Sequence, residues 1–516
     1  MRKRCVFPVF VVCLLCSVLL NGCHTGSKTE SEQPKVGALP PSSALPPNSW
    51  IVPADVSPTQ NPPQSSWTAL AWQTFVALNW PSAVPSNSSG ISGLPNPQLS
   101  IGASSSNQAM IPTVWLTYRS VANTMLPGAQ DPGVWQSNPV ALPSACATIG
   151  SLPVSPGFQP MVLDLVSKFS SPVVGSNVNE ASGPPLIEQS GWFVTYDIRI
   201  DQSEYAYIQQ NGYYNAATQI AAEAANKQLQ PIPQTGAGMP SLANFGALEV
   251  KAAWRILDPK NDQAIIPRYY TQVGYFLQQD GKTCQGPALF GLIGLHILRL
   301  TPTTPSTWFW STFEQVDNVA PPPQGGSATL ASANTPNGNC SSGTYNVAPT
   351  NYPANQNIPW TGTATPVVSV CQATNIDPAV AAINKTWQTN LQGTVWANYQ
   401  LIDTINPSVQ GGPSYTFAIS TATINTNIMA NTTMETYLQG DGAGKGQSCM
   451  DCHACATPQG AAGSATCTGT SSNQIFSFVL SNAGLPVSAT AAAKKRQQPR
   501  LPKKVLDILS GMGKHR

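Results

Sequence analysis

The chain has 516 residues, a formal net charge of +2 and only 9% charged residues, against about 25% in an average globular protein. So little charge excludes a coiled coil and a disordered polyampholyte, and 13 Trp, 14 Tyr and 14 Phe residues are enough for a large core. Basic residues gather at both ends, which leaves about −8 for residues 23–493. We therefore expect no nucleic-acid partner.

The N-terminus has the pattern of an export signal. A basic start is followed by the apolar run Cys5–Leu20 and then by small residues. The segment Leu20-Asn21-Gly22-Cys23 resembles the lipobox of bacterial lipoproteins, which implies cleavage before Cys23 and lipidation of that cysteine. His24 follows rather than Asp, and by the same resemblance this implies the outer membrane. We expect a protein of the bacterial cell envelope, lipid-anchored and facing the periplasm. An ordinary cleaved signal and a short uncleaved anchor are the alternatives.

The first part of the body alternates between one helix and several strands. Residues 23–66 are rich in Ser and Pro and are expected to form a tether. Apolar residues at helical spacing predict a helix over Trp67–Asn79. Alternating apolar residues predict strands over Trp192–Asp201 and Leu248–Leu257.

The second part continues the strands. Three more are predicted over Tyr269–Leu277, Phe290–Leu300 and Trp308–Val316, and Phe290–Leu300 should be central because both of its faces are apolar. The Pro/Gly/Asn/Ser-rich stretch 320–359 is too long for an ordinary connection and is interpreted as an insertion. A capped helix over Asp377–Gln392 and a strand over Thr394–Thr404 follow.

One short motif carries chemistry. Cys449-Met450-Asp451-Cys452-His453 is C-x-x-C-H, the attachment signal for c-type haem. Two thiols at this spacing form thioethers with the two haem vinyl groups, and the adjacent imidazole binds the iron. With the export signal, these residues make the chain resemble the c-type cytochromes, including uncharacterised bacterial proteins of the cytochrome c family. The resemblance implies one covalent haem c, held by Cys449 and Cys452, with His453 as the proximal iron ligand.

Other interpretations of these cysteines stay open. Cys449, Cys452, Cys455 and Cys467 are also a candidate zinc site. The first three resemble the start of a ferredoxin run, although the fourth Cys-Pro is missing. Structural disulfides are a further option. Apart from Cys23, Cys449 and Cys452, the mature chain has six cysteines, which permit up to three disulfides. Cys455–Cys467 and Cys340–Cys371 are the local candidates.

The sixth iron ligand is not fixed by the motif. The only methionine after it is Met512, in the basic tail. Met429 and Met434 precede the motif, and His296 is the only other histidine between residues 25 and 452. These three are the candidates, and a vacant site is a fourth option. His296 is more often a hydrogen-bonded core residue in such a strand, and Met434 more often packs in a helix.

Two short elements are predicted around the motif. Thr432-Thr433-Met434-Glu435 has the pattern of a capping box and predicts a helix that starts near Thr433. Residues 475–485 form a second short helix or strand whose aromatic residues are placed to cover a porphyrin.

The sequence as a whole predicts an α+β protein: a predominantly antiparallel β core with a few helices, plus a small C-terminal haem-binding segment. The expected parts are a lipoprotein signal (1–22), the tether (23–66), the β-rich domain (67–405), a haem c module (406–490) and a basic tail (491–516). The expected function is single-electron transfer with a redox partner protein. A haem-dependent periplasmic oxidoreductase, peroxidase- or oxygenase-like, and an assembly or binding lipoprotein with a structural haem are the alternatives. No catalytic residue and no small-molecule substrate are identified.

Overall fold

A computed structural model describes the body of the chain. The described residues, all within the unit Pro40–Arg516, are 45–56, 63–84, 93–103, 110–135, 142–149, 154, 157–164, 185–225, 227, 229, 246–277, 283–301, 304–323, 325, 327–331, 345–347, 369–372, 375–405, 429–438, 453, 456, 458 and 477–486. The predicted signal, Cys23, most of the 320–359 insertion and the basic tail lie outside them.

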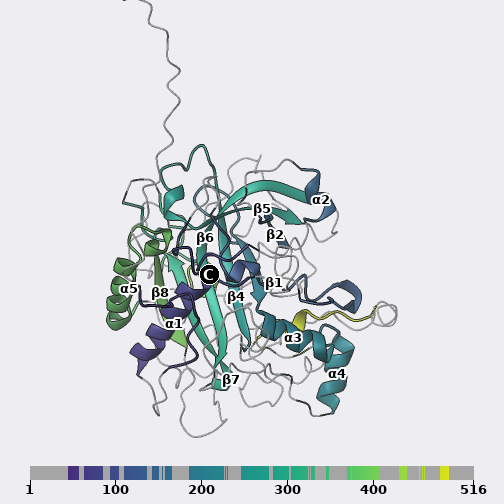
Figure 1. Ribbon diagram of the computed structural model, residues 1–516. Helices are drawn as coiled ribbons and strands as arrows, with labels where there is room; N and C mark the ends of the chain where they lie inside the picture. Colours follow the sequence, from purple (N-terminus) through teal and green to yellow (C-terminus); the bar gives the residue numbers. More distant parts are fainter. Residues whose placement is uncertain are drawn as a thin grey trace, which may run out of the picture. The chain divides into compact units, whose positions relative to one another are not determined.

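An eight-stranded sheet forms the core (Figure 1). One path through it runs β1-β3-β4-β6-β5-β2, and β7 pairs with β6 and with β8. All pairs are antiparallel except β2 with β5, so the sheet is mixed. The α+β prediction is confirmed, and the antiparallel pattern holds for all but one pair. The strands are β1 (Arg119–Ser120), β2 (Met161–Asp164), β3 (Thr195–Ile200), β4 (Leu248–Leu257), β5 (Thr271–Leu277), β6 (Cys284–Thr301), β7 (Thr304–Gln315) and β8 (Tyr399–Ile405).

The strand predicted to be central is central. β6 pairs with β4 along one edge, and with β5 and then β7 along the other. In the second half of β6, His296 lies between Lys251 on β4 and Thr312 on β7. The next row on the same face places Leu298 between Glu249 and Trp310.

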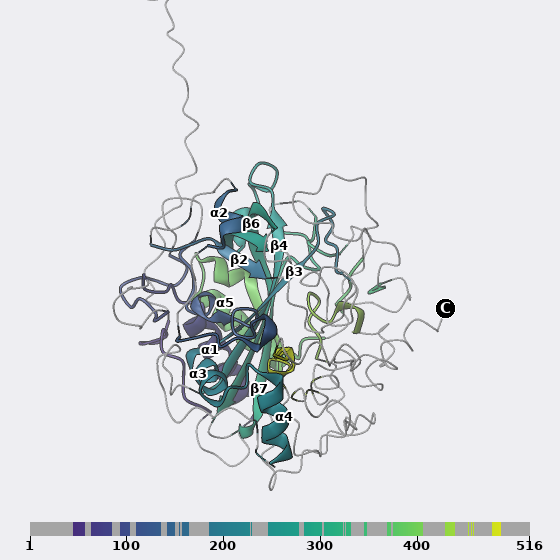
Figure 2. The same cartoon turned by 90° about the vertical axis from the view of Figure 1, so that its right-hand side faces the viewer.

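Two helices cover the first face of the sheet. Figure 2 shows α1 (Gln64–Leu78) and α5 (Pro378–Asn390) on one side of the sheet, and the yellow segment 477–486 on the other. Asp377 caps α5 as predicted, because its side chain accepts a hydrogen bond from the Ala379 amide at 2.7 Å. Stacked aromatic rings fill the contacts of α1 with the sheet and with α5. The ring centres of Phe75 on α1 and Phe313 on β7 are 4.2 Å apart, and those of Trp72 on α1 and Trp387 on α5 are 5.8 Å apart.

Residues placed in the tether by the sequence also contact this face. Val52 is fully buried in the main core. The Arg299 guanidinium on β6 donates to the Pro53 carbonyl at 2.7 Å and to the Thr74 hydroxyl at 2.8 Å. Residues 45–56 are therefore joined to the sheet by buried contacts.

Several short elements were not predicted. Asp201 caps α3 (Gln202–Asn211) by accepting from the Glu204 amide, and Gly212 ends it with a positive φ of 67°. Val395–Asn398 is a 3₁₀-helix and not the start of a strand, so the prediction for Thr394–Thr404 is wrong in its first half. The remaining helices of the described residues that were not predicted are α2 (Ser144–Ala147), α4 (Ala216–Ala224) and 3₁₀ turns at Trp115–Thr117, Pro127–Ala129 and Ile266–Arg268. Two further 3₁₀ turns lie where short elements were predicted: Thr436–Leu438, and Leu480–Asn482 within residues 475–485.

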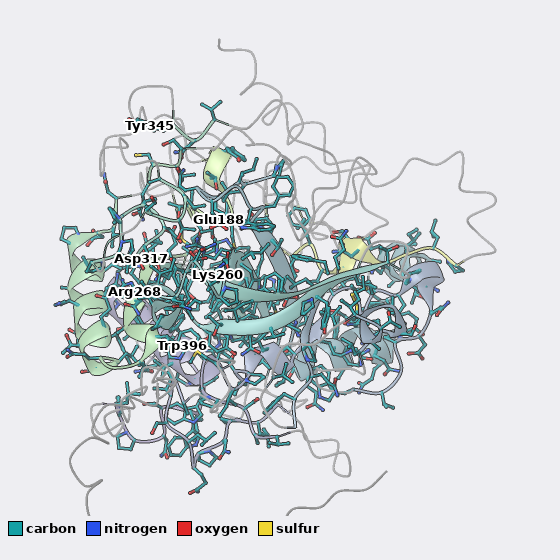
Figure 3. The ribbon with its side chains drawn as sticks, turned by 90° about the horizontal axis from the view of Figure 1, so that it is seen from above. Glu188, Lys260, Arg268, Asp317, Tyr345 and Trp396 are labelled. Carbon is teal, nitrogen blue, oxygen red and sulfur yellow. A yellow bond between two sulfur atoms is a disulfide. The ribbon has the colours of Figure 1, made fainter. Side chains whose placement is uncertain are left out.

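Ion pairs and a disulfide join the loops to one another and to the sheet. Arg268, in the 3₁₀ turn before β5, forms a bidentate ion pair with Asp317, just after β7, at 2.6 and 2.7 Å (Figure 3). Arg255 on β4 pairs with Glu188 at 2.8 Å. Cys146 on α2 is disulfide-bonded to Cys284 at the start of β6.

The other cysteine predictions are mostly not tested. The Cys146–Cys284 pair was not one of the two local candidates. Cys371 is also disulfide-bonded, whereas Cys340, Cys455 and Cys467 lie outside the described residues. Within the described part of the chain, no helix is long and apolar enough to cross a membrane.

Candidate functional site

The segment before the haem motif lies on the second face of the sheet. Asn431 donates from its side-chain amide to the Thr312 hydroxyl at 2.8 Å and to the Phe313 carbonyl at 3.0 Å. This close approach requires a glycine on β6, because a Cβ added at Gly294 would fall on Thr433 Oγ1. The sheet therefore holds residues 429–438 by hydrogen bonds to β7 and by side chains, Thr433 foremost, that lie directly on the β6 backbone at Gly294.

The capping box predicted here is shifted by one residue. Asn431 is the residue whose side chain caps the turn, since its Oδ1 accepts from the Thr433 amide at 2.8 Å. Glu435 reaches back to the Asn431 amide at 3.0 Å. The short helix predicted to start near Thr433 begins three residues later, as the 3₁₀ turn Thr436–Leu438, because Thr432 and Glu435 bind partners on the sheet.

Two buried carboxylates make those contacts with the sheet. Glu314 on β7 accepts from the Thr432 amide at 2.6 Å and from its hydroxyl at 2.5 Å. Burial raises the pKa of Glu314 to about 7, the Thr432 hydrogen bonds lower it, and the neighbouring Glu435 charge adds to the rise. Glu435 contacts His296 Nε2 with both oxygens, at 3.0 and 3.1 Å.

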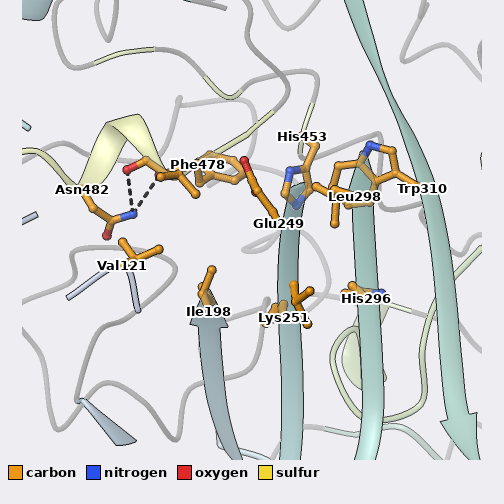
Figure 4. Close-up of a pocket in the computed structure, with 12 residues that line it drawn as sticks. Val121, Ile198, Glu249, Lys251, His296, Leu298, Trp310, His453, Phe478 and Asn482 are labelled. Atoms are coloured by element: carbon orange, nitrogen blue, oxygen red, sulfur yellow. Dashed lines mark hydrogen bonds between the residues drawn. The ribbon is translucent and has the colours of Figure 1, made fainter. Parts of the chain in front are cut away.

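His453, the last residue of the haem motif, is buried against the same face. Its side chain lies between two aromatic rings (Figure 4). The centre of the Trp310 ring on β7 lies 4.3 Å from the centre of the imidazole, with 73° between the ring planes. The centre of the Phe478 ring lies 4.9 Å from it, with 67° between the planes. The residue is only 7% exposed, so solvent has little access to the imidazole.

A small cavity of about 30 Å³ adjoins His453, and β3, β4, β6 and β7 contribute side chains to it. That volume holds a water molecule or two. The lining is mostly apolar with four ionisable side chains. It consists of Val121, Ile198, Glu249, Val250, Lys251, His296, Leu298, Trp310, His453, Phe478, Val479 and Asn482.

The structure separates the candidates for the sixth ligand. His296 lines the same cavity as His453, and its Nε2 is engaged with Glu435. Met429 packs in a cluster with Trp308 and Trp310, the ring that contacts His453. Met434 packs in a different cluster with Tyr196 and Ile293 and does not line the cavity. Cys449 and Cys452 lie outside the described residues.

Three residues of this site were not predicted to belong to it. Trp310 was interpreted only as part of the strand Trp308–Val316, and Glu249 and Lys251 only as part of the strand Leu248–Leu257. All three are buried: Glu249 is 5% exposed and Lys251 7%. The available signal was a pair of charged residues on a strand of a chain with so few charges.

An acidic pair lies at the edge of the cavity. Glu249 and Glu204 are neighbouring carboxylates, and both are buried. Burial is the main cause that raises the pKa of Glu204 well above its ordinary value, followed by the charges of Glu249 and Asp201. Burial also raises the pKa of Asp201 to about 8.

The residues present fit a haem in their chemistry. His453 offers an imidazole between aromatic walls, and the buried Trp310 Nε1 has no hydrogen-bond partner among the described residues, which suits an acceptor on a bound group. The enclosed space itself is too small for a porphyrin, so the cavity can receive only part of such a group. No cluster of three or more metal-binding side chains occurs among the described residues, and the four cysteines of the alternative zinc site are not among them.

No family model, no curated protein and no solved structure matches the chain.

Proposed function

We propose that the protein is an exported, lipid-anchored, monohaem c-type cytochrome that passes single electrons to or from a redox partner protein. One observation carries the proposal: the C-x-x-C-H motif of residues 449–453, whose histidine is buried between Trp310 and Phe478. In the proposal, thioethers at Cys449 and Cys452 and a bond from His453 hold the haem.

The chain's own residues have defined tasks in this proposal. A haem held here supplies a one-electron iron centre. Trp310 and Phe478 fix the plane of the His453 imidazole and exclude water from it. Asn431 and Glu435 anchor the chain that leads into the motif to a rigid sheet. Such confinement limits the movement of ligands when an electron arrives, which favours rapid transfer.

The expected location follows from the sequence. The signal and Cys23 support anchoring in the bacterial cell envelope, facing the periplasm and at the outer membrane. The redox partner would meet the protein there.

Spectroscopy of the haem-loaded protein tests the electron-transfer proposal. The full chain is expressed with haem-maturation machinery and released from the membrane. We expect low-spin spectra in both the oxidised and the reduced state, and fast, reversible reduction by a small one-electron donor. A high-spin iron that reacts with oxygen or peroxide contradicts simple electron transfer.

A second function is favoured by the ionisable lining of the cavity. Glu249, Lys251 and His296 line the same cavity as His453, and such groups move protons in many active sites. This supports the alternative of a haem-dependent periplasmic oxidoreductase. Binding of CO to the reduced protein and of cyanide to the oxidised protein favours this alternative, and the absence of both favours electron transfer alone.

A further inference from the structure

His453 lies between two rings that belong to different parts of the fold. Trp310 is on β7, which is hydrogen-bonded to a neighbouring strand along each edge. Phe478 is on residues 477–486, a segment that follows the haem motif in the chain and forms only one 3₁₀ turn. The position of the imidazole therefore depends on what holds this segment in place.

Helices α3 and α4 lie beside the segment in both views of the fold (Figures 1 and 2). Gln219 on α4 is fully buried, and its side-chain amide donates to the Leu480 carbonyl at 3.0 Å and to the Tyr213 carbonyl. The amide of Ala216, the first residue of α4, donates to the Gly484 carbonyl at 2.9 Å. Because the acceptors on the segment are backbone oxygens, α4 fixes the course of its main chain.

Apolar packing joins the same parts. One buried cluster contains residues of the segment, of both helices and of the sheet. Its members include Val479 and Leu480 of the segment, Ile208 of α3, Ala216 of α4 and Ile200 of β3. The helices are thus packed on the sheet that also carries Trp310, so one continuous body holds both rings against His453.

Two hydrogen bonds connect the turn of the segment to Phe478. The Phe478 carbonyl accepts from the Ser481 hydroxyl at 2.6 Å and from the Asn482 side-chain amide at 2.8 Å (Figure 4). Ser481 and Asn482 belong to the 3₁₀ turn that begins at Leu480, the residue bound by α4. A shift of this turn therefore also shifts Phe478 and its ring against His453.

We propose that α3 and α4 position the iron ligand: they hold the segment 477–486, and through it Phe478, against His453. The inference rests on the proposed function. It makes Gln219 and Ala216 positioning residues for the imidazole, although neither belongs to the C-x-x-C-H motif or lines the cavity. Partners outside the ligand set commonly fix the orientation of a histidine that binds a metal.

Two substitutions weaken the hold of α4 on the segment. Gln219→Met keeps the length of the side chain and removes its hydrogen bonds. Ala216→Pro removes the amide that binds Gly484 and keeps the helix, because proline suits a first helical position and Asn215 before it is extended, with φ −111° and ψ 116°. We expect amide exchange in residues 477–486 to become about five to thirty times faster in either variant.

Two further readouts report on His453 itself. In the full chain without haem, diethyl pyrocarbonate should modify His453 about five to thirty times faster than in the wild type, because the same opening exposes the ring. Peptide mass spectrometry follows the modification. In the haem-loaded protein, the electron paramagnetic resonance spectrum of the ferric iron should broaden, since it depends on the orientation of the imidazole plane. The haem content should stay at the wild-type value.

Matched controls place the same kinds of change away from the segment. Asn384→Leu removes a buried side-chain amide of α5 that donates to the Leu401 carbonyl at 2.8 Å on the first face. Gln202→Pro places a proline at the first position of α3, whose amide donates no hydrogen bond within the described part of the chain. Both controls should leave the modification rate of His453 and the resonance spectrum unchanged.

The outcomes distinguish the inference from the function on which it rests. If the wild type carries no covalent haem, the proposed function fails, and an unchanged modification rate in both variants overturns the inference as well. If covalent haem is present and both variants keep the wild-type resonance spectrum, the inference is overturned while the function stands.

A general loss of stability would also contradict the inference. If the controls change the readouts of His453 as much as the variants do, α4 has no specific effect on the imidazole. Near-ultraviolet circular dichroism identifies a variant that has lost its fold, in which case the other variant decides. If both have lost it, these contacts serve the whole fold, and the inference is overturned.

Discussion

The two faces of the sheet are built from different chemistry. The first face is sealed by α1 and α5 with aromatic rings, such as Phe75 against Phe313 at 4.2 Å. The second face buries ionisable side chains that make hydrogen bonds: His296 with Glu435, and Glu314 with Thr432. Because buried polar groups are costly unless they are satisfied, these hydrogen bonds are needed to keep the ionisable side chains in the second face.

The faces also differ in which parts of the chain cover them. Helices with strong apolar patterns cover the first face. Among the described residues, short segments cover the second face, and they include 429–438 and 477–486, with His453 between these two in sequence. Aromatic packing thus dominates the first face, where Arg299 adds hydrogen bonds to Pro53 and Thr74. The second face combines apolar packing with hydrogen bonds of buried carboxylates and His296.

Truncation on the first face should have the largest effect. Phe313→Ala removes a fully buried ring that contacts Phe75 and Trp72, and we expect a loss of about 3–5 kcal/mol in the free energy of unfolding. Urea denaturation at constant pH measures it. A loss below about 1 kcal/mol would show that this face does not depend on its aromatic packing.

The second face should respond to pH through Glu314. Its pKa is about 7 in the fold, against 4.5 as its ordinary value. Between these values the folded state binds more protons than the unfolded state, so stability falls as pH rises through the window, by about 3 kcal/mol.

Glu314→Gln should remove this loss while keeping an acceptor for Thr432. The measurement is urea unfolding of both proteins at several pH values between 4.5 and 7.5. Glu188 also has a pKa of about 7 and contributes the same sign in both proteins, so only the difference between their slopes is informative. Equal slopes would mean that Glu314 is ionised in the fold throughout this range.

A methyl group on β6 should disturb the docked segment. Gly294→Ala places a Cβ on the Thr433 hydroxyl, and we expect a loss of about 1–3 kcal/mol and faster hydrogen exchange in residues 429–438. The control is Gly291→Ala on the same strand, where the nearest atom is Leu257 Cδ1, the end of a side chain that can move. If both variants lose the same amount, the close contact of the Thr433 side chain with Gly294 is not what holds the segment.

The smallest effect on stability is expected at Phe478. Phe478→Leu removes one of the two rings against His453, and because the side chain is half-buried, we expect a loss of about 1 kcal/mol or less. The absorption spectrum of the haem-loaded protein should change nevertheless. An unchanged spectrum would show that Phe478 does not confine the imidazole.

Elements with strong periodicity could be predicted from the sequence. α1, α5, β4 and the central position of β6 follow from apolar spacing and from the Asp377 cap. Helix α3 was missed although its signals, Asp201 and Gly212, are present, because its apolar residues are few. The parallel β2–β5 pair has no local signal, since only the tertiary fold determines which strands meet.

The candidate site was only partly predictable. The spacing of the C-x-x-C-H motif identifies His453, and the apolar run Phe290–Leu300 predicts that His296 is buried. Trp310, Glu249 and Lys251 come from strands 143 to 204 residues before His453, and their contact with it depends on strand register and on the docking of later segments. The shift of the cap to Asn431 also depends on the tertiary fold, because Thr432 binds Glu314 on β7 and Glu435 binds His296 on β6.

The most direct test of the central claim is the intact mass of the denatured protein, with a pyridine haemochrome spectrum of the same sample. The protein is produced with haem-maturation machinery and compared with the Cys449→Ser/Cys452→Ser variant. We predict that one haem per chain survives denaturation of the wild type and that none remains on the variant. A wild type without covalent haem, or a variant that carries as much as the wild type, would contradict the account.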